Sequence, residues 1–120
     1  MNIPSDTTCF FMRQDETEPE VVSAGLKRRI IRTGKLMTVV IDFTSGPWEK
    51  PDPFHSHPHE QITYVAAGEL LFCSEGQEPE RLKTGDLIAI PPNKPHSVQI
   101  LSEHCRLIDS FHPIREDFLK

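Results

Sequence analysis

The amino-acid sequence predicts an all-β fold in one domain, an antiparallel sandwich or barrel. The chain has 120 residues, a common size for a single domain. Its β-branched and apolar residues fall in short runs of about five to seven residues, and turn-forming residues separate the runs about every ten residues. No segment before the C-terminus has a helical period, and regularly spaced short strands are typical of sandwiches and barrels.

The first third of the chain predicts an arm followed by a hairpin. Residues 1–20 are polar and acidic without a clear period, which indicates an arm. The runs LKRRIIRT (26–33) and KLMTVVIDFT (35–44) are separated by Gly34, so we expect two paired strands. Residues 47–54 contain three prolines, which predicts a loop because proline cannot donate to a strand ladder.

The rest of the sequence predicts five more strands and a C-terminal turn. The expected strands are QITYVAA, ELLFCS, DLIAIPP, HSVQIL and CRLIDSF, which are punctuated by Gly68, Gly76, Gly85 and Asn93. Residues 114–120 are expected to form a terminal turn of helix. We therefore expect an arm and first strand over 1–34, a barrel over 35–113 and a C-terminal turn over 114–120.

The charge of the chain argues against binding to nucleic acids or membrane surfaces. The formal net charge is −5, so the overall field repels phosphate groups. No apolar run approaches the length of a membrane span and the N-terminus lacks a signal-peptide pattern, which predicts a cytoplasmic protein. The cysteines have no paired spacing and are expected to be reduced thiols. An anionic small molecule would need a local cluster of arginines, for which the candidates are Arg28, Arg29, Arg32 and Arg115.

Closely spaced histidines indicate a metal site. In the segment HSHPHEQ, residues i and i+2 of an extended chain face the same way, so His55 and His57 can direct their nitrogens to one ion. A bend at Pro58 would return Gln61 to the same point. His59 shares the parity of the first two histidines and stays open as an alternative ligand.

A second segment adds a candidate ligand from another part of the chain. In GDLIAIPPNKPHSVQI (85–100), the PPNKP turn restricts the backbone and His96 opens the next strand. Such rigidity suits a metal ligand. For His104 and His112 we expect ordinary structural roles, as surface residues or hydrogen-bonded core residues.

These two segments resemble the motifs of the cupin superfamily. HSHPHEQITYVAAG supplies HxH, a residue at the position of the metal-binding Glu and Gly68, while GDLIAIPPNKPH supplies Gly85, Pro91 and His96. The resemblance implies a double-stranded β-helix, or jelly-roll barrel. Gln61 stands where the motif has Glu and leaves the full charge on the ion, which favours polarisation of a substrate oxygen over oxygen activation. Asn93 replaces the glycine of the second motif and tolerates the same left-handed backbone.

The last predicted strand directs a carboxylate inward. In CRLIDSFHPIRED, alternation places Asp109 on the face shared by Cys105, Leu107 and Phe111. A buried carboxylate is either paired or functional. Arg115 could supply the partner or bind an anionic substrate, and the plain alternative is that Asp109 caps a turn or pairs with a surface lysine.

The segments HSHPHEQ, PPNKPH and DSFHPIREDFL together resemble the KdgF-type cupins, which linearise unsaturated uronates in pectin and alginate breakdown. This resemblance implies that one divalent ion is bound by His55, His57, Gln61 and His96. It also implies that Asp109, Phe111 and Arg115 act on the substrate.

We therefore predict a metal-dependent ring-opening isomerase that converts 4,5-unsaturated monouronates, which are anionic sugar acids, to the linear 4-deoxy-5-keto uronate. The alternatives are an Fe(II) cupin dioxygenase with the same ligands and a non-catalytic metal- or sugar-binding cupin. Three histidines and an amide suit Ni, Zn, Mn, Fe or Co. Edge strands and the polar arm lead us to expect a homodimer.

Overall fold

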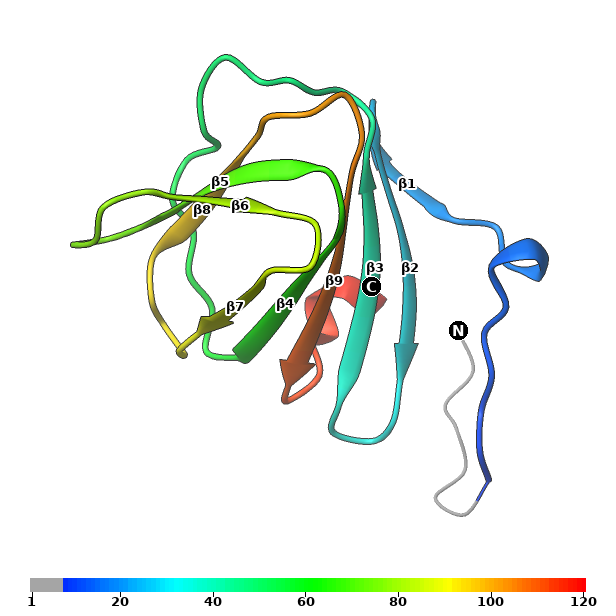
Figure 1. Ribbon diagram of the computed structural model, residues 1–120. Helices are drawn as coiled ribbons and strands as arrows, with labels where there is room; N and C mark the ends of the chain where they lie inside the picture. Colours follow the sequence, from blue (N-terminus) through cyan, green and yellow to red (C-terminus); the bar gives the residue numbers. More distant parts are fainter. Residues whose placement is uncertain (1–7) are drawn as a thin grey trace.

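The computed structural model describes residues 8–120, which form nine β-strands and two short 3₁₀ turns (Figure 1). The first seven residues of the predicted arm lie outside the described residues. Within the described part, no helix is long and apolar enough to cross a membrane. The elements in chain order are η1 (Gln14–Glu16), β1 (Glu20–Ser23), β2 (Leu26–Arg32), β3 (Met37–Phe43), β4 (Glu60–Ala67), β5 (Glu69–Ser74), β6 (Glu80–Lys83), β7 (Leu87–Ile90), β8 (His96–Ile100), β9 (Cys105–His112) and η2 (Glu116–Leu119).

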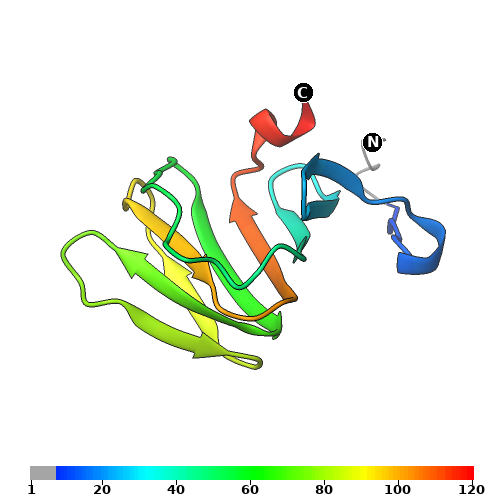
Figure 2. The ribbon, with the colours of Figure 1, turned by 90° about the horizontal axis from the view of Figure 1, so that it is seen from above.

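The strands form two antiparallel sheets, which appear as the two walls of the barrel in Figures 1 and 2. The larger sheet has the order β1-β2-β3-β9-β4-β7 and the smaller one the order β6-β5-β8. The chain passes between the sheets at Gly68, whose φ of +89° favours glycine. A Cβ atom at this position would also collide with the backbone of His104 and Cys105.

The predicted hairpin is confirmed, and the predicted strands agree with β4, β5, β7, β8 and β9. β2 and β3 pair in continuous register from Leu26↔Phe43 to Arg32↔Met37. The sequence prediction missed β1 and β6. Each has four residues and lies at the edge of its sheet, and β1 is exposed along its whole length. β6 has only one partly buried residue, Leu82, so neither strand has an apolar alternation to reveal it.

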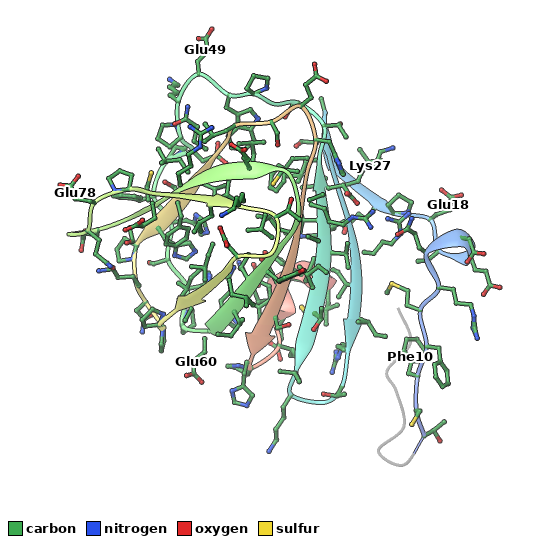
Figure 3. The ribbon with its side chains drawn as sticks, in the orientation of Figure 1. Phe10, Glu18, Lys27, Glu49, Glu60 and Glu78 are labelled. Carbon is green, nitrogen blue, oxygen red and sulfur yellow. The ribbon has the colours of Figure 1, made fainter. Side chains whose placement is uncertain are left out.

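Alternation along the strands separates the barrel interior from the solvent. In β4, Gln61 is buried whereas the neighbouring Glu60 is exposed and points away from the barrel (Figure 3). In β9, Cys105, Leu107, Asp109 and Phe111 are all buried, as predicted. Asp109 is only 6% exposed, so the alternative that it caps a turn or pairs with a surface lysine is wrong.

The buried apolar residues form two clusters, and the buried carboxyl group of Asp109 lies in β9 between Leu107 of one cluster and Phe111 of the other. One buried cluster is formed by Phe43, Val65, Leu70, Ile100, Cys105 and Leu107. A smaller cluster of Met37, Val39 and Phe111 packs against the C-terminal residues Ile114, Phe118 and Leu119. The predicted C-terminal turn is therefore present, as the 3₁₀ turn η2, and it lies against the barrel rather than apart from it.

Candidate metal centre

Two segments far apart in the sequence are tied together at the histidines. The loop that precedes β4 forms an isolated antiparallel bridge with the start of β8, in which His55 and His96 exchange two backbone hydrogen bonds of 3.0 and 2.9 Å. Because β8 is itself paired with β5 along its length, this bridge fixes the loop to a rigid sheet.

The PPNKP turn holds both sides of this bridge. Asn93 adopts the left-handed conformation expected for it, with a φ of 62°. Its N–H donates to the carbonyl oxygen of His57 at 2.7 Å. The ring of His96 is oriented by a 2.7 Å hydrogen bond between Nδ1 and the carbonyl oxygen of Lys94. The turn thus sets the position of two of the three rings.

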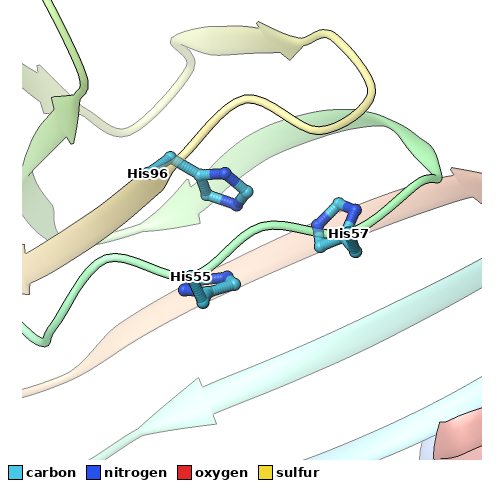
Figure 4. Close-up of side chains that lie close together, drawn as sticks. All are labelled: His55, His57 and His96. Atoms are coloured by element: carbon cyan, nitrogen blue, oxygen red, sulfur yellow. The ribbon is translucent and has the colours of Figure 1, made fainter.

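The structure brings His55, His57 and His96 into one group, as Figure 4 shows. One ring nitrogen of each histidine lies within 4.8 Å of those of the other two. Gln61 joins them, since its Oε1 lies 3.0 Å from Nε2 of His57. The chain therefore does turn back after Pro58, as the sequence suggested.

Hydrogen bonding around His57 leaves two lone pairs facing each other. The carbonyl oxygen of His59, 3.1 Å from Nδ1, and Gln61 Oε1, 3.0 Å from Nε2, can both only accept, whereas a neutral imidazole has a single proton to donate. Gln61 donates its Nε2 to Thr63 at 2.9 Å, which turns its Oε1 toward Nε2 of His57. A cation bound to both atoms removes this conflict. Adjacent ligands about 2.1 Å from one ion are about 3 Å apart, so the spacing fits a divalent metal.

The surroundings of His55 and His57 favour the form of imidazole that binds metals. Burial, together with the charges of His96, His57 and Arg115, lowers the pKa of His55 to about 4. Burial also lowers the pKa of His57. Both rings are therefore neutral near pH 7, and neutral imidazole is the metal-binding state.

His59 lies beside this group rather than in it. Its ring centroid is 5.5 Å from that of His57, and its nitrogens are not within the cluster of potential ligand atoms. Its buried Nδ1 has no hydrogen-bond partner among the described residues. The backbone carbonyl of His59, rather than its ring, interacts with the candidate ligands.

Asp109 is connected to the same group through a chain of hydrogen bonds. Thr63 accepts from Gln61 and donates to Asp109 Oδ1 at 2.6 Å. Burial raises the pKa of Asp109 to about 6, against the opposing effects of Thr63, Gln61 and Arg115. The carboxyl group can therefore exchange a proton close to neutral pH. Sequence reasoning missed Thr63, although its i+2 spacing from Gln61 in a strand could have identified it.

A cavity of about 230 Å³ joins these groups, and its lining includes His55, His96, Asp109, Phe111 and Arg115. Arg115 is close enough for its charge to affect the pKa values of both His55 and Asp109. Its hydrogen bonds, however, go to Asp117 at 2.8 and 3.3 Å, so Asp109 is paired with Thr63 instead. The sequence suggestion that Arg115 is the direct partner of Asp109 is not supported.

Of the other three candidate arginines, only Arg28 reaches the cavity. Its side chain is on the inward face of β2, opposite Ile41. Arg29 instead donates to the carbonyl oxygen of Thr17, and Arg32 to that of Thr33. The expected cluster of arginines is therefore smaller than the sequence suggested.

A β-barrel with inward-facing histidines on two such segments is the arrangement of the cupin family, and the chain belongs to this family: the cupin domain profile matches residues 39–111. The predicted single-domain cupin barrel is thus confirmed. Within the family, the chain is a homologue of the pectin degradation protein KdgF of Dickeya dadantii (strain 3937). The two are 44% identical over 107 residues, which span 88% of this chain and 94% of the relative.

Solved structures show the same relationship. The structure of KdgF from Halomonas sp. superposes with a TM-score of 0.81 and 33% identity, covering 91% of this chain and 99% of that chain. An RmlC-like cupin from Shewanella frigidimarina NCIMB 400 gives a TM-score of 0.81 and 34% identity, covering 92% and 96% of the two chains. The likeness therefore extends over nearly the whole barrel.

Proposed function

We propose that this protein is a metal-dependent enzyme that opens the ring of 4,5-unsaturated monouronates and gives the linear 4-deoxy-5-keto uronate. The observation that carries the proposal is that the cluster of three histidines adjoins a cavity whose lining includes His55, His96, a buried carboxyl group and an arginine. The homology to a pectin degradation protein supports a sugar acid as the substrate.

The reaction is an isomerisation in which no atom is gained or lost. The hydroxyl group at C1 loses its proton, the bond between C1 and the ring oxygen breaks, and C1 becomes an aldehyde. The former ring oxygen remains on C5 as an enolate. Protonation of this enolate at C4, by the proton released from C1, then gives the C5 ketone. The chemistry therefore requires one group that exchanges a proton and one region that stabilises charge on oxygen.

Asp109 is the group that we assign to the proton transfer. It is buried beside the histidines, and its pKa of about 6 lets it both accept and donate a proton near neutral pH. Thr63 fixes its orientation by donating to Oδ1. The same residue can therefore take up the proton released from C1 and deliver a proton to C4.

Arg115 and Phe111 are assigned to binding. The guanidinium group of Arg115 can form a charge-assisted, bidentate pair with the substrate carboxylate. Phe111 is 2% exposed and contributes an apolar wall to the cavity, next to the ring of His57. Together they orient the sugar acid relative to Asp109.

The ligands assigned to the ion are His55, His57, Gln61 and His96. Bound there, a divalent ion would supply Lewis acidity to a substrate oxygen, and a neutral ligand set leaves its full charge available.

The proposal is tested by incubating the purified protein, loaded separately with Ni, Zn, Mn, Fe or Co, with an unsaturated monouronate from a pectate or alginate lyase digest. Loss of the absorbance of the unsaturated bond, faster than in a protein-free control, is the expected result. An identical rate with and without protein for all five metals would refute the proposal.

A further inference from the structure

The C-terminal turn η2 contacts the side chain of Arg115 on two sides. Asp117 accepts two hydrogen bonds from its Nε and Nη2 atoms, at 3.3 and 2.8 Å. The guanidinium carbon of Arg115 also lies 4.1 Å from the ring centroid of Phe118 and 5.2 Å from that of Phe111. Asp117 thus binds one edge of the guanidinium group, and the two aromatic rings lie near the guanidinium carbon. The Nη1 atom takes no part in the hydrogen bonds to Asp117.

Phe118 is itself held by Arg28, which belongs to β2. Its ring centroid lies 4.3 Å from the guanidinium carbon of Arg28, and its carbonyl oxygen accepts a hydrogen bond of 3.5 Å from the same arginine. Glu20 binds Arg28 through two hydrogen bonds of 2.7 and 3.2 Å. Phe118 also packs edge-to-face on Phe111 at 5.8 Å. One ring thus contacts two guanidinium groups.

The charges explain why two like-charged groups can share this ring. Each arginine has its own carboxylate, Glu20 for Arg28 and Asp117 for Arg115, so each pair is close to neutral. Both arginine side chains are only 15% exposed, which strengthens the attraction between a cation and an aromatic face compared with an exposed site. Burial and the two carboxylates therefore both stabilise the contact of Phe118 with the two arginines.

We propose that Phe118 is the positioning residue for Arg115: its ring, held by Arg28 and Phe111, orders the guanidinium group in the cavity before the substrate carboxylate arrives. This inference rests on the proposed function, because it makes the affinity for a sugar acid depend on how Phe118, which also lines the cavity, orders Arg115. Arginine has a flexible side chain, and ordering such a chain during binding weakens the affinity. Pre-ordering by Phe118 removes that loss.

The test compares two substitutions of the same ring. Phe118→Leu keeps an apolar side chain but removes the aromatic face, whereas Phe118→Tyr keeps the face. Leu119→Ala, in the same turn, controls for a general loss of packing. We expect Phe118→Leu to raise KM about tenfold while kcat changes less than threefold, the pattern of weakened binding with intact chemistry. Phe118→Tyr should restore KM to within about twofold of the wild-type value.

A double-mutant cycle shows whether the effect passes through Arg115. In an Arg115→Met background, Phe118→Leu should change kcat/KM less than twofold, because no guanidinium group remains to be ordered. A further tenfold loss in that background would overturn the inference. So would a Leu119→Ala variant that raises KM as much as Phe118→Leu does.

A spectroscopic measurement does not depend on turnover. In Zn²⁺-loaded protein, the NMR signal of the Arg115 Nε–H group should be shifted by the ring current of Phe118, and Phe118→Leu should abolish the shift. An unchanged signal would overturn the inference even if the enzyme is active.

If the wild type consumes no unsaturated uronate, the proposed function fails. In that case the saturated sugar acid galacturonate serves as the probe of carboxylate binding. Loss of both the NMR shift and galacturonate binding in Phe118→Leu would still show that Phe118 positions Arg115 for a carboxylate.

Discussion

Replacement of Asp109 by Asn should make the protein more stable and less active at the same time. Asp109 is 6% exposed, and burial raises its pKa from 3.8 to about 6. Between these two pH values the folded state holds a proton that the unfolded state has lost. Stability therefore falls as the pH rises through this window, and the loss is complete above pH 6 to 7. Asn has the same shape, cannot ionise, and still accepts the hydrogen bond from Thr63.

The shift of about two pKa units sets the size of the effect. At about 1.4 kcal/mol per unit, Asp109→Asn should raise the free energy of unfolding by about 3 kcal/mol at pH 8 but by less than about 1 kcal/mol at pH 4. Urea unfolding of EDTA-treated protein at both pH values measures this difference without a contribution from bound metal. Turnover of the metal-loaded variant should fall by roughly 10² to 10⁴, the range for a positioned acid or base.

Asp42 provides a matched control in the same sheet. Hydrogen bonds from Arg106 and His104 outweigh the effect of burial and lower its pKa, so Asp42 stabilises the fold above its unfolded pKa and loses this effect as the pH falls. Asp42→Asn should therefore destabilise the protein at pH 8, the opposite of Asp109→Asn. A stability change for Asp109→Asn that is negative at pH 8, or equal at pH 4 and 8, would show that burial does not perturb this carboxyl group as we infer.

Further substitutions address the metal ligands and a turn. His96→Ala should remove the bound divalent ion, and elemental analysis showing about one ion per chain in this variant would contradict the assigned site. His59→Ala should keep most of the metal whereas Gln61→Ala should weaken its binding, and the reverse result in a metal titration would make the ligand assignment wrong. Gly68→Ala should lower stability far more than Gly76→Ala, because both have positive φ but only Gly68 has backbone atoms where a Cβ would lie; equal melting temperatures would contradict this.

Much of the barrel could be predicted because its strands have one buried face. The alternation in CRLIDSF is enough to place Asp109 inside the barrel, since a strand has a period of two. β1 and β6 could not be found in this way because edge strands of four residues bury too little to show a pattern.

The candidate site was predictable only where its residues are close in sequence or belong to a known motif. The spacing of His55, His57 and Gln61 is local, and the structure does bring them together. The contact between Arg28 and Phe118 joins residues 90 positions apart, and it depends on how the C-terminal turn packs on the sheet. Nothing in the sequence pattern encodes that pairing.

The proposed mechanism depends above all on Asp109, which would deliver a proton to C4 from one side of a bound unsaturated uronate. The direct test is to run the reaction in D₂O with metal-loaded protein and to examine C4 of the product by NMR. Because a fixed acid protonates one face, we expect one deuterium at C4 in a single configuration with the wild type, and loss of this accelerated reaction with Asp109→Asn. An equal mixture of both configurations at C4, or single-configuration product formed at the normal rate by the Asn variant, would contradict the mechanism.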